Sequence, residues 1–246
     1  MSIPTPDRAT PDGPTPDGPT PDGPAPDRRT LIADAAIATV AAAGLRGLTH
    51  RAIDTAAGLP AGSTSYYFRT RTALIGACYA RIEERDLADL ADLVELDGLA
   101  DLVEPADLDG VDDLAATHAA THAAERPRPP SRDEAAASLG ALLHHWMTAG
   151  RERQLARYEL SLEAARTPEL AAALHRTGLA ARARAAAVVA ALGAARPEEA
   201  GELLVAWTDG VLFDRLAGAP ARTRPAPDPA ELTALARRML DGVLAP

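Results

Sequence analysis

Residues 49–68 read THRAIDTAAGLPAGSTSYYF, and this stretch predicts two short helices joined by a tight turn. Thr49 is a suitable N-cap for the first helix. The inward-facing positions of that helix recur at three- and four-residue steps, the spacing of one buried helical face: Ala52, Ile53 and Ala56. Gly58 can end the helix in a left-handed conformation, and Pro60 suits the start of the next one.

The second helix is expected from Ala61 to about Tyr67. It begins with side chains small enough to approach a base edge: Ala61, Gly62, Ser63 and Thr64. Two helices with a short Gly-containing turn, the second one small and polar at its start, match a DNA-binding helix-turn-helix. The spacing alone leaves open a helical hairpin that binds no DNA.

A longer segment around this motif resembles a known family. Residues 32–75 read IADAAIATVAAAGLRGLTHRAIDTAAGLPAGSTSYYFRTRTALI and are similar, without a gap over 44 residues, to the N-terminal domain of tetracycline-repressor (TetR) family regulators. The positions that carry the resemblance are Ala35, Ala36, Gly44, Ile53, Ala57, Gly58, Gly62, Phe68, Arg71 and Leu74. The resemblance implies a three-helix DNA-binding head followed by a helical body that binds a ligand and dimerises.

The resemblance also implies which side chains meet DNA. Most would contact phosphates, with base edges met from the start of the second helix, and Ala61 joins them because it is small: Thr49, Arg51, Ala61, Ser63, Thr64, Tyr66, Tyr67 and Arg71. Three positions depart from the family pattern. Ser65 replaces a common Tyr, Arg71 replaces Lys with its charge kept, and Asp54 replaces Ala. The acid of Asp54 is expected either to face solvent or to be unfavourable toward phosphate.

Composition favours an all-α chain of one or two domains. The 246 residues are 47% hydrophobic, largely Ala and Leu, and only eight are aromatic. Scarce strand formers and recurring helical periodicity indicate helices throughout. The predicted architecture is an N-terminal three-helix helix-turn-helix head at 28–75 and a ligand-binding and dimerisation body at 76–246.

The distribution of charge supports a DNA-binding head. The net charge of −10 argues against a nucleic-acid partner when taken over the whole chain. Residues 28–81, however, hold seven arginines and two aspartates, a net charge of +5, whereas residues 82–134 hold four arginines and sixteen acids, a net charge of −12. A basic head on an acidic body is typical of a DNA-binding protein whose body does not touch DNA.

Two segments are predicted to lie outside the folded core. Residues 1–27 repeat TPDGP three times, which predicts a disordered tail because Pro, Gly and Asp cannot form an apolar face. Residues 97–130 are expected to be a flexible acidic insertion. This insertion contains His118 and His122 at a two-ligand metal spacing, but no third ligand is evident, so neither a metal site nor a cofactor is predicted.

The single cysteine and the lack of any secretory or membrane-spanning stretch predict a cytoplasmic protein without a membrane partner. Cys78 shares an apolar helical face with Leu74 and Ile82, which favours a buried packing role over a redox role.

The body is predicted to contain helices that begin near Arg71, Ser131, Pro168, Pro197 and Pro229. Polar groups on otherwise apolar helices are the candidates for a ligand pocket: His145, Trp146, Tyr158, Glu159, Trp207 and Phe213. The last two helices are expected to pair with those of a second subunit through apolar side chains: Leu203, Leu204, Val211, Leu212, Leu235 and Met239.

These features predict a homodimeric repressor that a small-molecule effector releases from pseudo-palindromic double-stranded operator DNA. An activator, or a regulator without an effector, would have the same head. An enzyme is not predicted, because the chain lacks a nucleophile elbow, a phosphate-binding glycine loop and a metal-ligand set. The alternative from another class is a helical protein-interaction module without sequence-specific DNA binding.

Overall fold

A computed structural model describes residues 27–93 and 130–245, and these two ranges contain nine α-helices and no strand. The prediction of an all-α fold is therefore confirmed for this part of the chain. The predicted tail at 1–27 and the predicted acidic insertion at 97–130, with His118 and His122, lie outside the described residues, each apart from its last residue.

The head and the helix that leaves it follow the predicted order: α1 (Arg28–Gly47), α2 (His50–Ala56), α3 (Ser63–Tyr67) and α4 (Arg71–Leu93). Thr49 caps α2 by accepting a hydrogen bond from the Ala52 amide, and Thr70 caps α4 in the same way through the Ala73 amide. Gly44, with φ of 64°, interrupts α1 one turn before its end, a conformation that residues with a side chain rarely adopt.

The body contains five further helices: α7 (Arg132–Met147), α8 (Arg151–Ala164), α9 (Pro168–Ala191), α10 (Pro197–Leu216) and α11 (Pro229–Val243). The three helix starts predicted at prolines are confirmed. A capping box begins α7, in which Ser131 and Glu134 each accept a hydrogen bond from the other's backbone amide.

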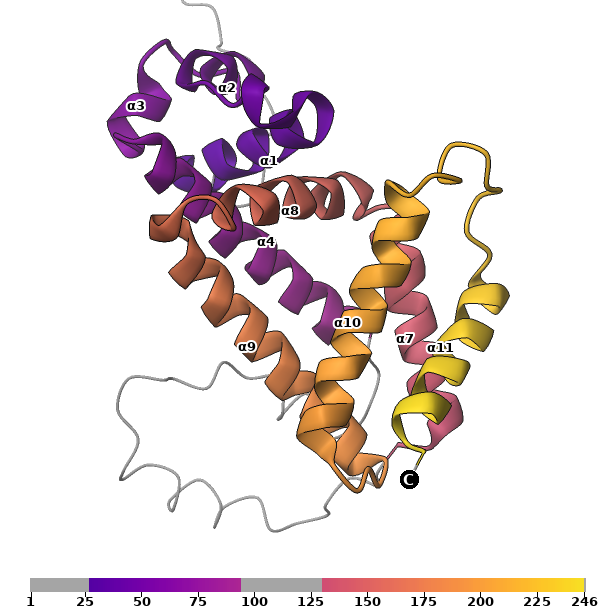
Figure 1. Cartoon of the computed structure of the whole chain (residues 1–246). Helices are drawn as coiled ribbons and strands as arrows, with labels where there is room; N and C mark the ends of the chain where they lie inside the picture. Colours follow the sequence, from indigo (N-terminus) through magenta and orange to yellow (C-terminus); the bar gives the residue numbers. More distant parts are fainter. Residues whose placement is uncertain (1–26, 94–129, 246) are drawn as a thin grey trace, which may run out of the picture.

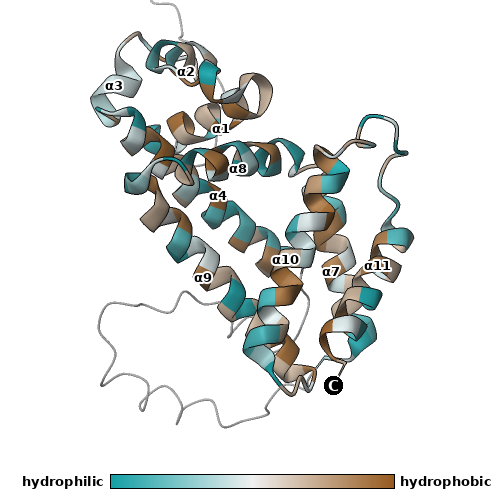
Figure 2. Ribbon diagram, in the orientation of Figure 1, coloured by the Kyte–Doolittle hydropathy of each residue, from teal (hydrophilic) through white to brown (hydrophobic). Residues whose placement is uncertain are grey.

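Helix α8 lies directly beneath the head, and α4 descends from the head into the body (Figure 1). The long helices form two close pairs, α7 with α11 and α9 with α10. Glycines allow both approaches, because a Cβ on Gly140 would lie 2.7 Å from the Thr233 Cα, and one on Gly201 would lie 2.5 Å from the Ala186 nitrogen. Hydrophobic and hydrophilic residues alternate around these helices (Figure 2), as expected of helices with one buried face.

The core of the head continues into the body. Its buried side chains come from α1 to α4, but α8 and the start of α9 supply four more: Ala156, Leu160, Ala164 and Leu170. Tyr79 and Ile82 of α4 belong to the same cluster. A single buried cluster thus extends across the predicted domain boundary at residue 75.

Helix α1 is long and apolar enough, by length and composition, to cross a membrane. Its buried residues instead form part of the head core: Ile32, Ala33, Ala36, Ile37 and Val40.

Candidate DNA-binding site and ligand cavity

The start of the second helix of the motif, α3, is fixed by a carboxylate from the first. Asp54 is almost fully buried, and it accepts hydrogen bonds from the Gly62 amide (2.7 Å), the Thr64 amide (2.7 Å) and the Thr64 hydroxyl (2.6 Å). Burial raises the pKa of Asp54, but the hydrogen bonds from Thr64 and Gly62 outweigh burial and leave the pKa below its usual value. The carboxylate is therefore a charged cap on α3.

The other end of α3 is also attached to α2. The His50 Nε2 atom lies 2.9 Å from the Phe68 carbonyl oxygen, which follows the last turn of α3. A helix of five residues does not form alone, because nucleation is unfavourable and only propagation offsets it. Contacts from both ends of α2 thus hold α3 in place.

These contacts require two corrections to the sequence predictions. Asp54 neither faces solvent nor approaches phosphate, because it is turned inward to cap α3. Thr64 was predicted to touch DNA, but it is fully buried and its hydroxyl is bound to Asp54, so that prediction is wrong. The sequence did not predict the Asp54–Thr64 hydrogen bond. The only signal for it was an acidic residue ten positions before a threonine.

The remaining predicted DNA contacts lie on or near the surface of the motif. Thr49, Arg51 and Ala61 are exposed, and 79% of Tyr66 is exposed. Tyr67 is half-buried and packs edge-on against Tyr66, with ring centroids 5.1 Å apart. These five residues remain predicted DNA contacts.

Two other predicted contacts also bond within the head. The Ser63 hydroxyl donates to the Pro60 carbonyl, and the Arg71 guanidinium donates to the carbonyls of Leu45 (2.7 Å) and Leu48 (2.6 Å). Arg71 is exposed and keeps further donors for a phosphate. Arg69, which the sequence analysis passed over, is an additional exposed cation beside α3.

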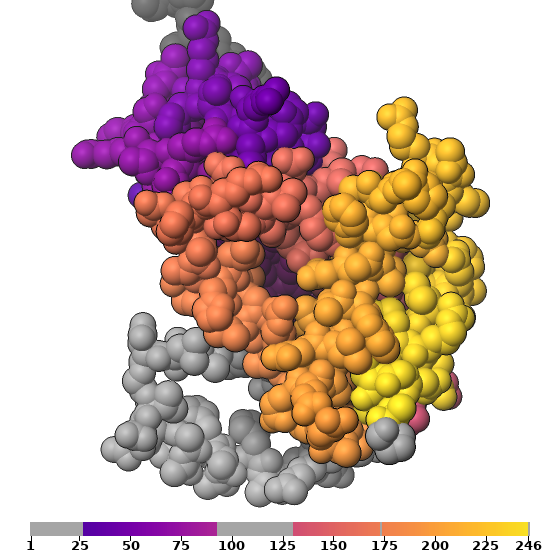
Figure 3. Space-filling model, viewed as in Figure 1, coloured from indigo at the N-terminus to yellow at the C-terminus, as the bar shows by residue number. Residues whose placement is uncertain are grey.

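A cavity of about 750 Å³ lies in the body, lined mainly by apolar side chains of α4, α7, α8, α9 and α10. The space-filling view shows a hollow bounded by α8, α9 and α10, with α4 visible at its floor (Figure 3). This volume suits a small organic ligand. The cavity shares four wall residues with the head core: Tyr79, Ile82, Ala164 and Leu174.

One side of the cavity contains a network of charged groups between α4 and α8. Asp86 accepts hydrogen bonds from the Arg153 guanidinium (2.8 Å) and the Gln154 amide (3.1 Å). Asp89 is bound to Arg153 and also accepts from the Trp146 indole (2.9 Å). Burial raises the pKa of Asp86, and the nearby arginine charges oppose that rise. The network ties α4 to α7 and α8.

A second ion pair connects α8 to α10. Arg157 donates to the Asp209 carboxylate at 2.7 Å, and the Tyr158 hydroxyl donates to the Asp209 carbonyl at 2.9 Å. Burial raises the pKa of Tyr158 to about 12, so the hydroxyl stays protonated. Arg157 and Asp209 line the cavity, whereas Tyr158 does not.

Of the six predicted pocket residues, only Trp146 lines this cavity. The other five do not line it: His145 lies 3.2 Å from Asp89, Tyr158 stacks edge-on against Phe213, and Glu159, Trp207 and Phe213 lie outside the wall. The sequence showed which side chains were polar or aromatic but not which face of each helix turned inward. Missed polar wall residues include Tyr79, Glu83, Asp86, Thr177 and Arg184.

The predicted dimer residues are divided between the core and the surface. Leu204, Leu212 and Met239 are buried within the chain's own core, so they are not available to a second subunit and the prediction is wrong for them. Val211 and Leu235 are half-buried against the same core clusters. Leu203 alone of the six is exposed, at 40%.

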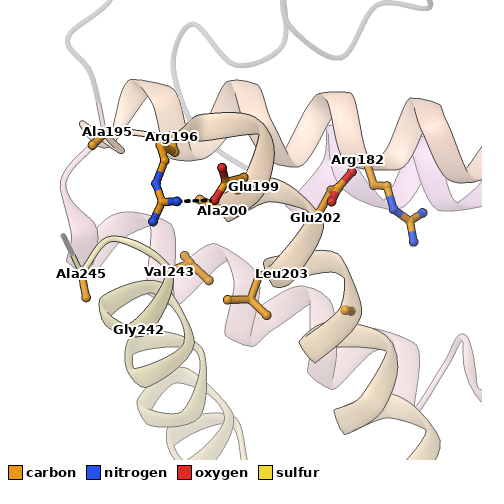
Figure 4. Close-up of a pocket in the computed structure, with 11 residues that line it drawn as sticks. Arg182, Ala195, Arg196, Glu199, Ala200, Glu202, Leu203, Gly242, Val243 and Ala245 are labelled. Atoms are coloured by element: carbon orange, nitrogen blue, oxygen red, sulfur yellow. Dashed lines mark hydrogen bonds and ion pairs between the residues drawn. The ribbon is translucent and has the colours of Figure 1, made fainter.

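The exposed apolar face of α10 has a helical spacing: Leu203, Ala206, Trp207, Gly210 and Phe213. Trp207 and Phe213 are 37% and 49% exposed. A groove of about 640 Å³ adjoins Leu203 and Ala206, between the start of α10 and the end of α11 (Figure 4). The Arg196–Glu199 ion pair lies on its border. We name Leu203, Ala206, Trp207, Gly210 and Phe213 together the α10 stripe.

The structure also locates the single cysteine and the described side chains of the types that bind metals. Cys78 is buried, and burial raises the pKa of its thiol to about 12, which agrees with a packing role. Within residues 27–93 and 130–245, no group of three or more His, Cys, Asp or Glu side chains could hold a metal ion.

The chain is similar to known proteins along most of its length. Residues 130–246 match the family described as "Tetracyclin repressor-like, C-terminal domain". A member of the TetR family from Streptomyces coelicolor A3 is 25% identical, with a TM-score of 0.59 over 90% of this chain and all of that one. The multidrug binding protein EbrR complexed with malachite green is 26% identical, with a TM-score of 0.58 over 90% and 100% of the two chains.

A transcriptional regulator from Rhodococcus sp. Rha1 shares the fold, with a TM-score of 0.61 at 20% identity over 88% of this chain and 96% of the other. The search of curated proteins gave no match. A helix-turn-helix head joined to a helical body with an internal cavity defines a DNA-binding transcriptional regulator. Residues 130–246 thus match a TetR C-terminal domain, and solved TetR-family regulators share the fold of the chain.

Proposed function

We propose that the chain is a homodimeric repressor that leaves a pseudo-palindromic operator when a small molecule enters the body cavity. The observation that carries the proposal is the sharing of Tyr79, Ile82 and Ala164 between the cavity wall and the head core. A ligand that displaces these side chains would favour a different position of the head. Its effect on operator affinity can be no larger than its differential affinity for the two positions.

The relatives support an effector of this kind. The EbrR structures contain ethidium or malachite green, and we propose that the corresponding body of this chain also binds a small molecule. We further propose that its role is regulatory and not enzymatic, as is typical of the family.

The α10 stripe is proposed as the dimer contact. Apolar side chains at this spacing would pair with the same stripe of a second copy around a twofold axis. Two heads related in this way would bind two half-sites about one helical turn of DNA apart. The exposed Arg51, Tyr66 and Arg69 are proposed to contact that DNA.

The test is selection of bound fragments from genomic DNA of the source organism by the full-length chain, followed by fluorescence anisotropy at fixed, near-physiological salt. We expect one dimer per pseudo-palindromic site and an affinity that falls steeply with salt. Arg51→Ala should weaken binding about tenfold, whereas Arg222→Ala, which removes an exposed arginine from the α10–α11 connection, should not.

No enrichment of any sequence would support the interaction-module alternative and contradict the proposal. Equal losses of DNA affinity in Arg51→Ala and Arg222→Ala would show that the loss comes from the lower net charge and not from a contact made by the head. A reporter gene with the selected operator then separates repressor from activator, because a repressor requires expression to rise when the gene for this chain is deleted.

A further inference from the structure

The acids that line the cavity are almost all engaged by donors. Asp86 accepts from Arg153 and Gln154, and Asp209 accepts from Arg157. Glu83, at the centre of α4, accepts a hydrogen bond of 3.1 Å from the Thr177 hydroxyl. Glu202 is exposed and faces solvent. Asp86 and Asp209 are therefore paired with arginines, and Glu83 is bonded to a hydroxyl.

Arg184 is the exception among the cations. It is half-buried in the cavity wall, and within the described residues it makes no hydrogen bond or ion pair. Arg182 donates to the Gly178 carbonyl, and Arg157 is paired with Asp209. Burial lowers the pKa of Arg184, and the Glu83 charge opposes this only from a distance. A guanidinium removed from water without a partner favours an anion beside it.

A second polar group without a protein partner lies at the head end of the cavity. The Tyr79 hydroxyl is buried and has no hydrogen-bond partner among the residues that the structure describes, and burial raises its pKa to about 12. It therefore remains a neutral phenol that can donate one hydrogen bond.

The Glu83–Thr177 hydrogen bond sets the register of the two helices that present these groups, and both helices run from the head side toward the far end of the body (Figure 1). Tyr79 lies one turn before Glu83, and Arg184 lies two turns after Thr177. At 1.5 Å per residue the backbones of Tyr79 and Arg184 are about 16 Å apart along the helix axes. Mainly apolar side chains line the space between them.

We propose that the effector is an elongated, mostly apolar monocarboxylate whose carboxylate pairs with Arg184. This inference rests on the proposed function, because it specifies the ligand of the same cavity. One planar guanidinium matches one carboxylate in a two-bond fork. A doubly charged phosphate would be repelled by Glu83 and Asp86, and a cation would leave Arg184 unpaired.

The experiment compares three unbranched ligands of ten carbon atoms each, namely decanoate, decylammonium and decanol, below their micellar concentrations. Isothermal titration calorimetry on the full-length dimer measures each affinity. Decanoate should bind at least tenfold more tightly than the other two. Arg184→Gln should lower decanoate affinity at least tenfold, because the charged fork is lost, and leave decanol affinity unchanged.

Two further variants serve as controls. Arg222→Gln removes an equal charge from an exposed connection and should retain the preference for decanoate. Arg184→Lys keeps the charge but loses the fork, so the preference should be intermediate. Unchanged decanol binding and an unchanged melting temperature would show that the Arg184 variants are folded.

Tightest binding of decylammonium, no binding of any of the three ligands, or an undiminished preference in Arg184→Gln would overturn the inference. The proposed function has a separate readout. If the chain selects an operator but does not prefer decanoate, the regulator remains and the carboxylate inference fails. If no operator is selected, the proposed function fails whichever ligand binds.

Discussion

At the scale of single residues, the Asp54 carboxylate controls the position of α3. Three hydrogen bonds join it to Gly62 and Thr64, and it is the only charged side chain buried in the described part of the head. The backbone amides at a helix start carry a partial positive charge, which an ionised carboxylate stabilises.

We therefore expect Asp54→Ala to lower the free energy of unfolding by about 3 kcal/mol, because it leaves buried donors without an acceptor. It should also weaken operator binding more than tenfold, since α3 loses its attachment to α2. Chemical denaturation and anisotropy measure the two effects. The control is Asp92→Ala, which removes an exposed acid from α4. A similar loss of stability and of operator affinity in this control would contradict the role of Asp54 as the cap on α3.

The lowered pKa of Asp54 also predicts a dependence on pH. The folded state binds the Asp54 proton more weakly than the unfolded state does, so the stabilisation is complete above the unfolded pKa, about 3.9. It is lost as pH falls through the folded pKa. The difference in unfolding free energy between the wild type and Asp54→Ala should thus narrow below about pH 4, and urea titrations at several pH values would detect a constant difference if the prediction is wrong.

In contrast to the Asp54 carboxylate, the Tyr79 hydroxyl is not expected to stabilise the fold. Because this hydroxyl bonds to nothing in the described part of the chain, Tyr79→Phe should leave the free energy of unfolding unchanged or raise it by up to about 1 kcal/mol. Tyr158→Phe is the matched control, since that hydroxyl donates to the Asp209 carbonyl and its removal should cost about 1 kcal/mol. Thermal denaturation without ligand compares the two, and a larger loss in Tyr79→Phe would show that its hydroxyl is bonded.

At the scale of elements, the body depends on helices that approach closely at glycine. Helix α7 packs on α11 where Gly140 faces the backbone of Thr233, and α9 packs on α10 where Gly201 faces Ala186. Backbone cannot move aside as a long side chain can, so even one methyl group separates the helices.

Gly140→Ala should therefore destabilise the chain by about 1–3 kcal/mol through overpacking, although alanine is the better helix former. Gly76→Ala is the control, because a Cβ on Gly76 meets nothing within 4 Å and the change should stabilise α4 by up to about 1 kcal/mol. Thermal melts of the two variants should shift in opposite directions. A shift in the same direction would show that α7 and α11 can separate at little cost.

At the scale of the whole molecule, the α10 stripe is an exposed apolar surface with helical spacing. Leu203→Glu should shift the chain toward a monomer and weaken operator binding, because two half-sites then bind independently. Sedimentation velocity measures the oligomeric state, and anisotropy measures the affinity. Leu162→Glu provides the control, since Leu162 is 55% exposed on α8 and outside the stripe. Unchanged sedimentation of Leu203→Glu would contradict the proposed contact.

Sequence reasoning succeeded where local chemistry determines structure. The helix starts at Arg71, Pro168, Pro197 and Pro229 follow from caps and prolines, which act within one turn. It failed where side chains must meet across elements. Leu204 and Leu203 are adjacent and equally apolar, yet one is buried in the subunit and the other is exposed, because the direction of packing of α10 separates them.

The sequence by itself thus determined an all-α chain, a helix-turn-helix at residues 49–68 and the positions of the long helices. Hydrophobic periodicity, helix caps and helix-breaking residues depend only on residues that are close in the sequence. Only the tertiary structure decided that Asp54 caps α3 and that Trp146 alone of the predicted pocket residues lines the cavity. It also decided that Arg184 lies in the cavity wall without a hydrogen bond or ion pair to any described residue. These outcomes depend on which faces of distant helices meet, and that choice is made by the packing of the whole core.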